Sequence, residues 1–198
     1  METAAGAHLP TGVSPPRVIA YRLTSTIAPA PMSIADLLLP ELDNEIAVTR
    51  RVLERVPDGK GEWKPHEKSF PLAHLAQLVA RMPGWLGMTL GRTELDIAPV
   101  EGPRSPGYSI ETTATLLAEF DRNAADARAA LAGATDADFD VPWTLKAAGH
   151  VVMTKSRYDI VRWMVLNHLV HHRAQLGVYL RLLDVPVPQM YGPTADDR

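Results

Sequence analysis

The sequence predicts a single all-α domain, a four-helix bundle with a small β-hairpin before its last helix. Three observations lead to this prediction. Apolar residues recur every three or four positions from Ser33 onward, which is the helical period. A second helical pattern runs with no proline from Ser156 to Asp184. Between them, short β-prone stretches flank the turn-like Ala147-Ala148-Gly149.

The chain of 198 residues is long enough for one sizeable core and too short for two comfortable domains. Residues 1–31 are rich in proline, glycine, serine and threonine, so we expect a disordered N-terminal extension there. Residues 32–198 are then the bundle domain. Met32 equally fits a true translation start, in which case the upstream segment is not part of the native protein.

Capping signals and breaks set the expected elements. Ser33 and Asp36 resemble a capping box, and the regular part of the first helix is expected to begin at Pro40, a residue tolerated in a first turn. The long connection 91–108 contains repeated glycine and proline and is expected to hold no regular element. The expected elements are a first helix from Ser33 to Val56, a second from Phe70 to Met82, a third from Ile110 to Leu131, a hairpin from Val141–Leu145 and Val151–Thr154, and a last helix from Ser156 to Asp184.

Composition excludes several classes of protein. The 20 Lys and Arg against 23 Asp and Glu give a net charge of −3, which offers nothing to nucleic acid or to an anionic membrane. No apolar run approaches the length of a membrane span, and no signal peptide is apparent, so a cytoplasmic protein is expected. Because there is no cysteine, only His, Asp and Glu are strong metal donors.

The last helix carries histidines on its apolar face. At about 100° per residue, His168 and His172 lie with Val165 and Leu176, whereas Arg173 lies on the opposite, polar side. Two imidazoles one turn apart converge closely enough to share a metal ion. The alternative is a pair of hydrogen-bonded core histidines.

Neighbouring residues of this helix have lesser roles in this interpretation. His171 lies about 60° off the face and is a supporting or surface group. Arg173 is more simply a surface salt bridge. Trp163, Leu166 and Val170 share the outer face, and this apolar patch predicts a homodimer seam.

Several segments resemble a known family. They are Asn167–Leu176, Asp184–Pro188, Tyr191–Asp196, Trp63–Ser69, Pro83–Trp85 and Pro142–Lys146. Together they are similar to the DinB family of DinB/YfiT-like proteins over about residues 32–197. The resemblance implies an up-down-down-up four-helix bundle, usually dimeric, with a three-histidine divalent metal site whose open position faces a pocket.

Carried over by position, two ligands of that site fall on His168 and His172. The third falls on Leu78, at the end of Leu75-Ala-Gln-Leu78, where the family has histidine. His74 lies one turn earlier and is the candidate replacement, so the expected metal ligands are His168, His172 and His74. The alternative is that His74 is a groove histidine. The metal is Zn, Ni, Fe or Mn, since histidine sites accept all four.

The resemblance implies a metal-dependent enzyme of the thiol S-transferase, isomerase or hydrolase type, acting on a small molecule, with a low-molecular-weight thiol as a candidate partner. The alternative is a non-catalytic dimeric bundle with a degenerate metal site, serving in small-molecule binding or stress response. The position of His74 relative to the other two histidines distinguishes these hypotheses. DNA binding, suggested by the family's damage-inducible name, conflicts with the acidic charge.

Overall fold

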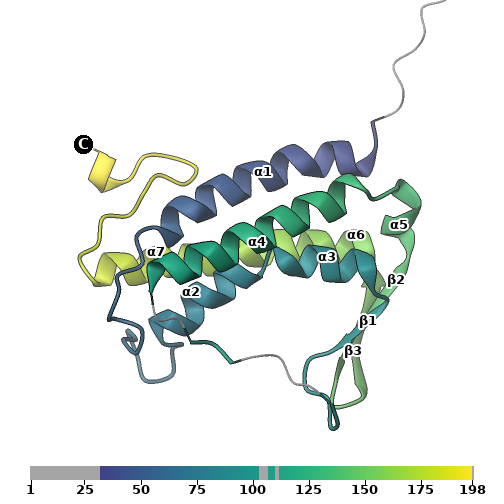
Figure 1. Ribbon diagram of the computed structural model, residues 1–198, viewed down its shortest axis with the longest axis horizontal. Coiled ribbons are helices and arrows are strands. Elements are labelled where there is room, and N and C mark those ends of the chain that lie inside the picture. The colour runs from purple at the N-terminus through teal and green to yellow at the C-terminus, as the bar shows by residue number, and fades with distance from the viewer. Residues whose placement is uncertain (1–31, 103–106, 110–111, 198) are drawn as a thin grey trace, which may run out of the picture. The chain divides into compact units, whose positions relative to one another are not determined.

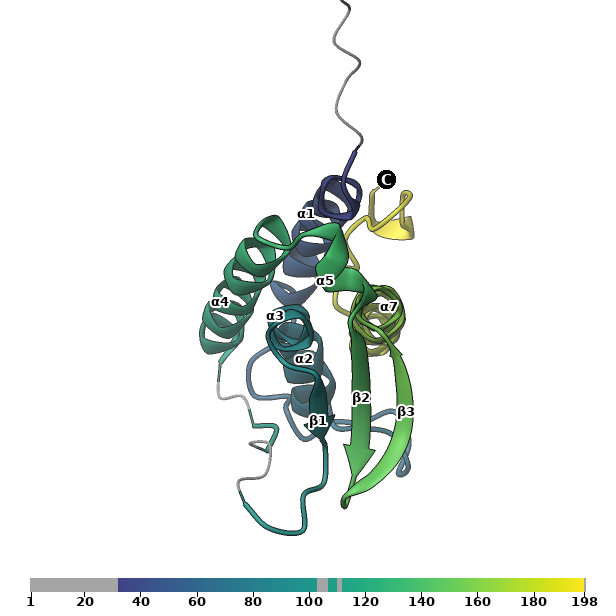
Figure 2. The ribbon, with the colours of Figure 1, turned by 90° about the vertical axis from the view of Figure 1, so that its right-hand side faces the viewer.

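Helices make up most of the molecule, and a small sheet stands at one end of them (Figures 1 and 2). The computed structural model describes residues 32–102, 107–109 and 112–197. The predicted extension 1–31 lies outside them. The helices are α1 (Ile34–Leu53), α2 (Leu72–Arg81), α3 (Gly84–Gly91), α4 (Thr113–Ala132), α5 (Asp136–Asp140), α6 (Arg157–Ile160), the π-helix η1 (Val161–Asn167), α7 (His168–Leu182) and the short 3-10 helix η2 (Ala195–Asp197).

The first helix begins as predicted and continues where a break was expected. Ser33 and Asp36 form a reciprocal capping box in which each side chain accepts a hydrogen bond from the other's backbone N–H. The expectation that the regular helix starts at Pro40 is wrong, because α1 runs through this residue. Pro40 lies on the exposed face, so the carbonyl left without a partner one turn earlier is open to water.

The second predicted helix is present as α2, and a further helix follows it. α2 ends at Arg81, and α3 begins at Gly84 with Pro83 at its N-cap. Proline lacks the N–H that a first turn leaves unused, so it can start a helix as well as end one. The interpretation of Pro83-Gly84 as a stop therefore missed α3.

The predicted hairpin is present, and a third strand joins it. β2 (Pro142–Ala147) pairs antiparallel with β3 (His150–Ser156), and β1 (Glu94–Asp96) pairs parallel with β2. The expectation of no regular element in 91–108 is thus wrong for β1. The Asp96 carboxylate accepts hydrogen bonds from the backbone N–H groups of Ala98, Ala148 and Gly149, which ties β1 to the hairpin turn.

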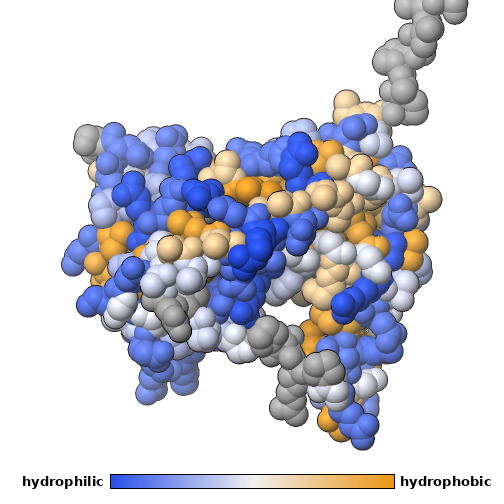
Figure 3. Space-filling model, in the orientation of Figure 1, coloured by the Kyte–Doolittle hydropathy of each residue, from blue (hydrophilic) through white to orange (hydrophobic). Residues whose placement is uncertain are grey.

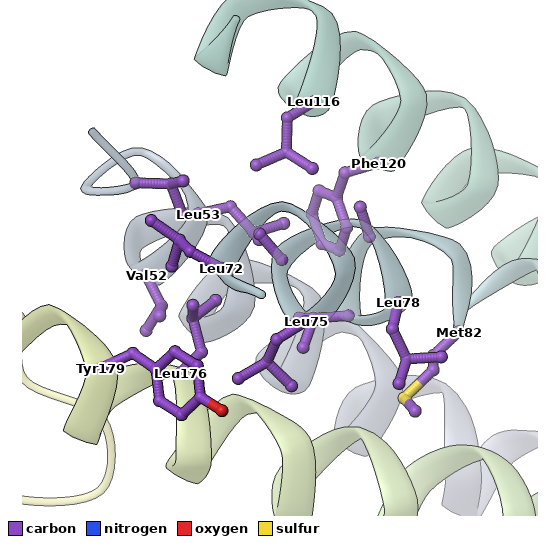
Figure 4. Close-up of a cluster of buried hydrophobic side chains, with 14 of the residues drawn as sticks. Val52, Leu53, Leu72, Leu75, Leu78, Met82, Leu116, Phe120, Leu176 and Tyr179 are labelled. Carbon is purple, nitrogen blue, oxygen red and sulfur yellow. The ribbon is translucent and has the colours of Figure 1, made fainter. Parts of the chain in front are cut away.

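The main core lies where α1, α2, α4 and α7 meet (Figure 4). Its central side chains are almost fully excluded from solvent. They include Val52, Leu53, Leu72, Leu75, Met82, Leu116, Phe120 and Leu176. Burial of each such side chain contributes on the order of 1.5–3 kcal/mol to the stability of the fold.

The structure as a whole is mostly helical with a small three-stranded sheet. Within the described residues, no helix is both long and apolar enough to cross a bilayer.

A buried ion pair joins the last helix to the first. The Arg173 guanidinium lies 2.6 Å from the Glu45 carboxylate, and both side chains are buried. Arg173 also donates to the Thr49 hydroxyl at 3.0 Å and to the Tyr191 hydroxyl at 2.6 Å. The Tyr191 hydroxyl in turn donates to Glu45. The C-terminal segment that follows α7 is thereby attached to α1.

This network corrects the expectation for Arg173, which was a surface salt bridge on the polar side of the last helix. The residue is fully buried. Periodicity places side chains around one helix and has no information about Glu45, which lies 128 residues earlier in the sequence.

We predict that Arg173→Met destabilises the fold by about 3–5 kcal/mol, because it leaves the Glu45 charge buried without its partner. The measurement is the free energy of unfolding from urea titration. The matched control is Arg128→Met, which breaks an exposed pair with Asp43 and is expected to cost about 0.2–1 kcal/mol. Equal losses in the two variants would contradict a structural role for the buried pair.

Candidate functional site

The pitch of the last helix changes just before the histidines. Residues Val161–Asn167 form a π-helix, and α7 begins at His168. π-turns inside α-helices are rare and occur mostly at functional sites. The wider turn changes the rotation per residue, so a face calculated at 100° per residue does not hold across it. Sequence reasoning missed this segment, since no residue in it signals a π-turn.

One predicted surface fails for this reason. Trp163 is 51% exposed, but Leu166 is 1% exposed and packs in the core. Trp163, Leu166 and Val170 therefore do not form one outer patch. The homodimer itself stays a prediction.

His168 and His172, here called the histidine pair, face each other. Their Nε2 atoms are 2.9 Å apart, and His172 Nδ1 lies 2.7 Å from the side-chain oxygen of Gln175. If that oxygen accepts from His172 Nδ1–H, the Nε2 of His172 carries a lone pair directed at His168. The same facing nitrogens suit an N–H···N hydrogen bond or two donors to one ion.

Burial is the main influence on the charge of the pair. Burial lowers the pKa of His168, and the nearby His171 lowers it further. The Met164 carbonyl opposes that shift, although its alignment with Nδ1 of His168 does not amount to a hydrogen bond. Burial likewise lowers the pKa of His172, against the opposing effect of Gln175. Both rings are thus held in the neutral form that can bind a metal or accept a proton.

The third expected ligand is not brought into a three-residue group. The His74 ring is stacked between Phe70 and Tyr108, with ring centroids 4.1 and 4.0 Å away. Burial lowers the pKa of His74, and its charge contributes to lowering that of His172. Among the residues that the structure describes, no three His, Asp or Glu side chains are grouped to hold a metal ion. His74 as a ligand stays a prediction.

Leu78, at the position where the resemblance implies a histidine, belongs to the core. It is 7% exposed and packs in the same cluster as Met82 and Leu169 (Figure 4). His171 is exposed, with its ring 4.9 Å from that of His172 and 6.3 Å from that of His168. As arranged here, the described residues bring together the two nitrogens of the histidine pair, and the three-histidine site stays a prediction.

A pocket opens beside the pair, between the sheet and the helices. It has a volume of about 250 Å³, and we call it the apolar pocket. Its lining is Trp85, Met88, Thr89, Leu95, Ile97, Trp143, Leu145, Ile160, Met164, Val165 and His168. His168 thus belongs both to the histidine pair and to the pocket wall. Sequence reasoning missed the pocket, because its walls come from three separate parts of the chain.

A second recess lies on the other side of the pair. It has a volume of about 380 Å³, and we call it the polar groove. Its lining is Lys68, Ser69, Phe70, His172, Gln175, Val178 and Tyr179. A larger recess of about 580 Å³ lies on α3 and α4, where Trp85 and Met88 line both it and the apolar pocket, and the Arg81–Glu119 ion pair contributes to its wall.

Comparisons with known proteins agree on one family. The model of the DinB superfamily matches residues 41–176. A DinB-like protein from Bacillus cereus ATCC 10987 is similar in structure, with a TM-score of 0.61 and 17% identity, over 81% of this chain and 99% of that one. A DinB-like protein (YjoA) from Bacillus subtilis has a TM-score of 0.57 and 13% identity, over 78% of this chain and 97% of that one. At these identities the likeness concerns the fold. No curated protein matches.

The lowered pKa values of the pair predict acid sensitivity. In the unfolded chain these rings take up protons below about pH 6.5, whereas in the folded chain they do so only at lower pH. The free energy of unfolding is therefore highest above about pH 6.5 and decreases as the pH falls through that value. In chelator-treated protein, we expect the melting temperature to fall between about pH 7 and pH 5. His172→Asn should make this fall shallower, and His150→Asn, at the exposed start of β3, should not. Identical profiles for all three proteins would assign the acid sensitivity to other groups.

Proposed function

The chain belongs to the DinB superfamily, and we propose that within it this protein binds a small, largely apolar molecule against the histidine pair. One observation carries the proposal: His168 lines the apolar pocket while its Nε2 lies 2.9 Å from that of His172. Apolar pockets with a few well-placed polar groups are the usual form of small-molecule sites. The ligand would contact apolar walls and meet a neutral imidazole at one point.

Metal-dependent catalysis is the second candidate function, as a transferase, isomerase or hydrolase. The convergence of two neutral Nε2 atoms favours it. A divalent metal would there supply Lewis-acid activation of a bound oxygen or sulfur. The protein offers two donors for it among the described residues, so a third would have to come from His74 after rearrangement or from the ligand.

We also propose the finer architecture that the resemblance implies. α1, α2 with α3, α4, and the composite helix α6–η1–α7 would be the four helices of an up-down-down-up bundle. The packing of α1 and α2 against both α4 and α7 supports it. A homodimer in the cytoplasm completes the proposal, and the exposed apolar Trp163 and Leu182 of the last helix are candidate contacts.

Binding in the pocket is tested with N-phenyl-1-naphthylamine, a neutral probe that fluoresces in apolar surroundings. We expect saturable binding at one site per chain. Ile97→Asp places a charge at the exposed rim of the pocket and should weaken binding about tenfold, or about 1.4 kcal/mol. The control is Val100→Asp, which adds the same charge at a more exposed position outside the pocket lining. Equal affinities in the two variants would place the probe elsewhere.

The metal hypothesis is tested by restoring the missing ligand. We expect the untagged wild-type protein to bind Zn²⁺ or Ni²⁺ weakly, and Leu78→His to raise the affinity at least about tenfold by supplying a third imidazole. The measurement is metal per chain by elemental analysis, together with a calorimetric titration. His168→Ala should abolish binding, and His150→Ala should leave it unchanged. His74→Ala separates the remaining cases: metal lost from this variant of the wild type would show that His74 already serves as third ligand.

A further inference from the structure

The inner face of the last helix changes character at the histidine pair. Before it, Ile160, Met164 and Val165 line the apolar pocket with His168. After it, Gln175 and the residues that follow line the polar groove with His172. The two Nε2 atoms are 2.9 Å apart, so the wall of the pocket touches the wall of the groove at the pair. A ligand that reached both recesses would lie along one helix, with the pocket as the apolar half of its site and the groove as the polar half.

The apolar half suits an apolar group. Besides His168 and the buried Thr89, its lining has only the indole N–H groups of two tryptophans, and that of Trp143 is buried. Any charge that entered would lose its water without gaining a partner of opposite charge.

The polar half carries one positive charge. Lys68 lines it, and its ammonium group forms no ion pair or hydrogen bond within the part of the chain that the structure describes. Ser69 and Gln175 add uncharged polar groups, and neither Asp nor Glu lines the groove. An anion is therefore the head group that this half complements.

On the face seen in Figure 3, hydrophilic residues cover the loop before α2, and hydrophobic ones gather beside the three-stranded sheet. Along the helix the two halves are about 6 Å apart at their nearest residues, His168 and His172, and about 15 Å apart from Met164 to Gln175, so a ligand of intermediate length reaches from one half into the other.

We propose that the ligand is an amphipathic anion, a molecule with a chain-like or ring-containing apolar body and a single carboxylate-type head group. The body occupies the apolar pocket, the molecule passes over the histidine pair, and the head group lies beside Lys68 in the polar groove. This inference rests on the proposed binding function and adds the charge and orientation of the ligand.

The experiment displaces N-phenyl-1-naphthylamine with three ten-carbon competitors at pH 7.5, all below micelle-forming concentrations: decanoate, decan-1-ol and decylamine. They share one apolar chain and differ in head-group charge. In wild type we expect decanoate to compete about threefold to fivefold better than decan-1-ol, the range for one partly exposed charge pair, and decylamine to compete worst. The preference should shrink at about 0.5 M NaCl.

Matched variants assign the preference to its residue. Lys68→Gln should bring the decanoate to decan-1-ol ratio to about one, and Lys60→Gln, an exposed change in the same loop outside the groove, should leave it unchanged. Equal competition by decanoate and decan-1-ol in wild type would overturn the inference and leave the binding function standing. A probe that does not bind at all would overturn both.

Discussion

The buried pair of Arg173 and Glu45 is the constraint on which the candidate site depends. Arg173 follows His172 directly, so fixing its guanidinium on α1 fixes the rotation of the last helix about its own axis. With that rotation set, His168 and His172 turn toward α2 and the sheet. Two charges taken out of water are costly unless each is fully partnered, and here Thr49 and Tyr191 supply further hydrogen bonds. A specific contact, formed at a high desolvation cost, therefore orients the helix that carries the site.

Local chemistry in the sequence predicted much of the fold. The capping box at Ser33, the uninterrupted pattern of the last helix and the turn at Ala148-Gly149 all depend on residues within a few positions of one another. The features that were missed depend on partners far along the chain. β1 is three residues long and exists because it pairs with β2 some fifty residues later. The burial of Arg173 depends on Glu45 in the same way.

The candidate site also combines features set by nearby residues with features set by residues far apart in the sequence. The facing of His168 and His172 follows from their spacing of four on one helix, which a sequence displays directly. The apolar pocket does not, because α3, the sheet and the π-helical segment each supply part of its wall. The π-turn is a response of the backbone to the packing around it, and no residue type predicts it. The sequence therefore predicted the histidine pair and did not predict the apolar pocket beside it.

The leucine at position 78 affects the two candidate functions unequally. Catalysis by a bound metal needs the ion held tightly with one position open, and two protein nitrogens hold it less well than three. Binding of an amphipathic molecule needs only an apolar wall, a neutral imidazole and a cation at the far end. Leu78 is part of the apolar core. The His74 ring is stacked between Phe70 and Tyr108, so in this structure the histidine pair stands without a third imidazole. The binding function is therefore compatible with every ligand set that the histidines can form, whereas the catalytic one depends on the third donor.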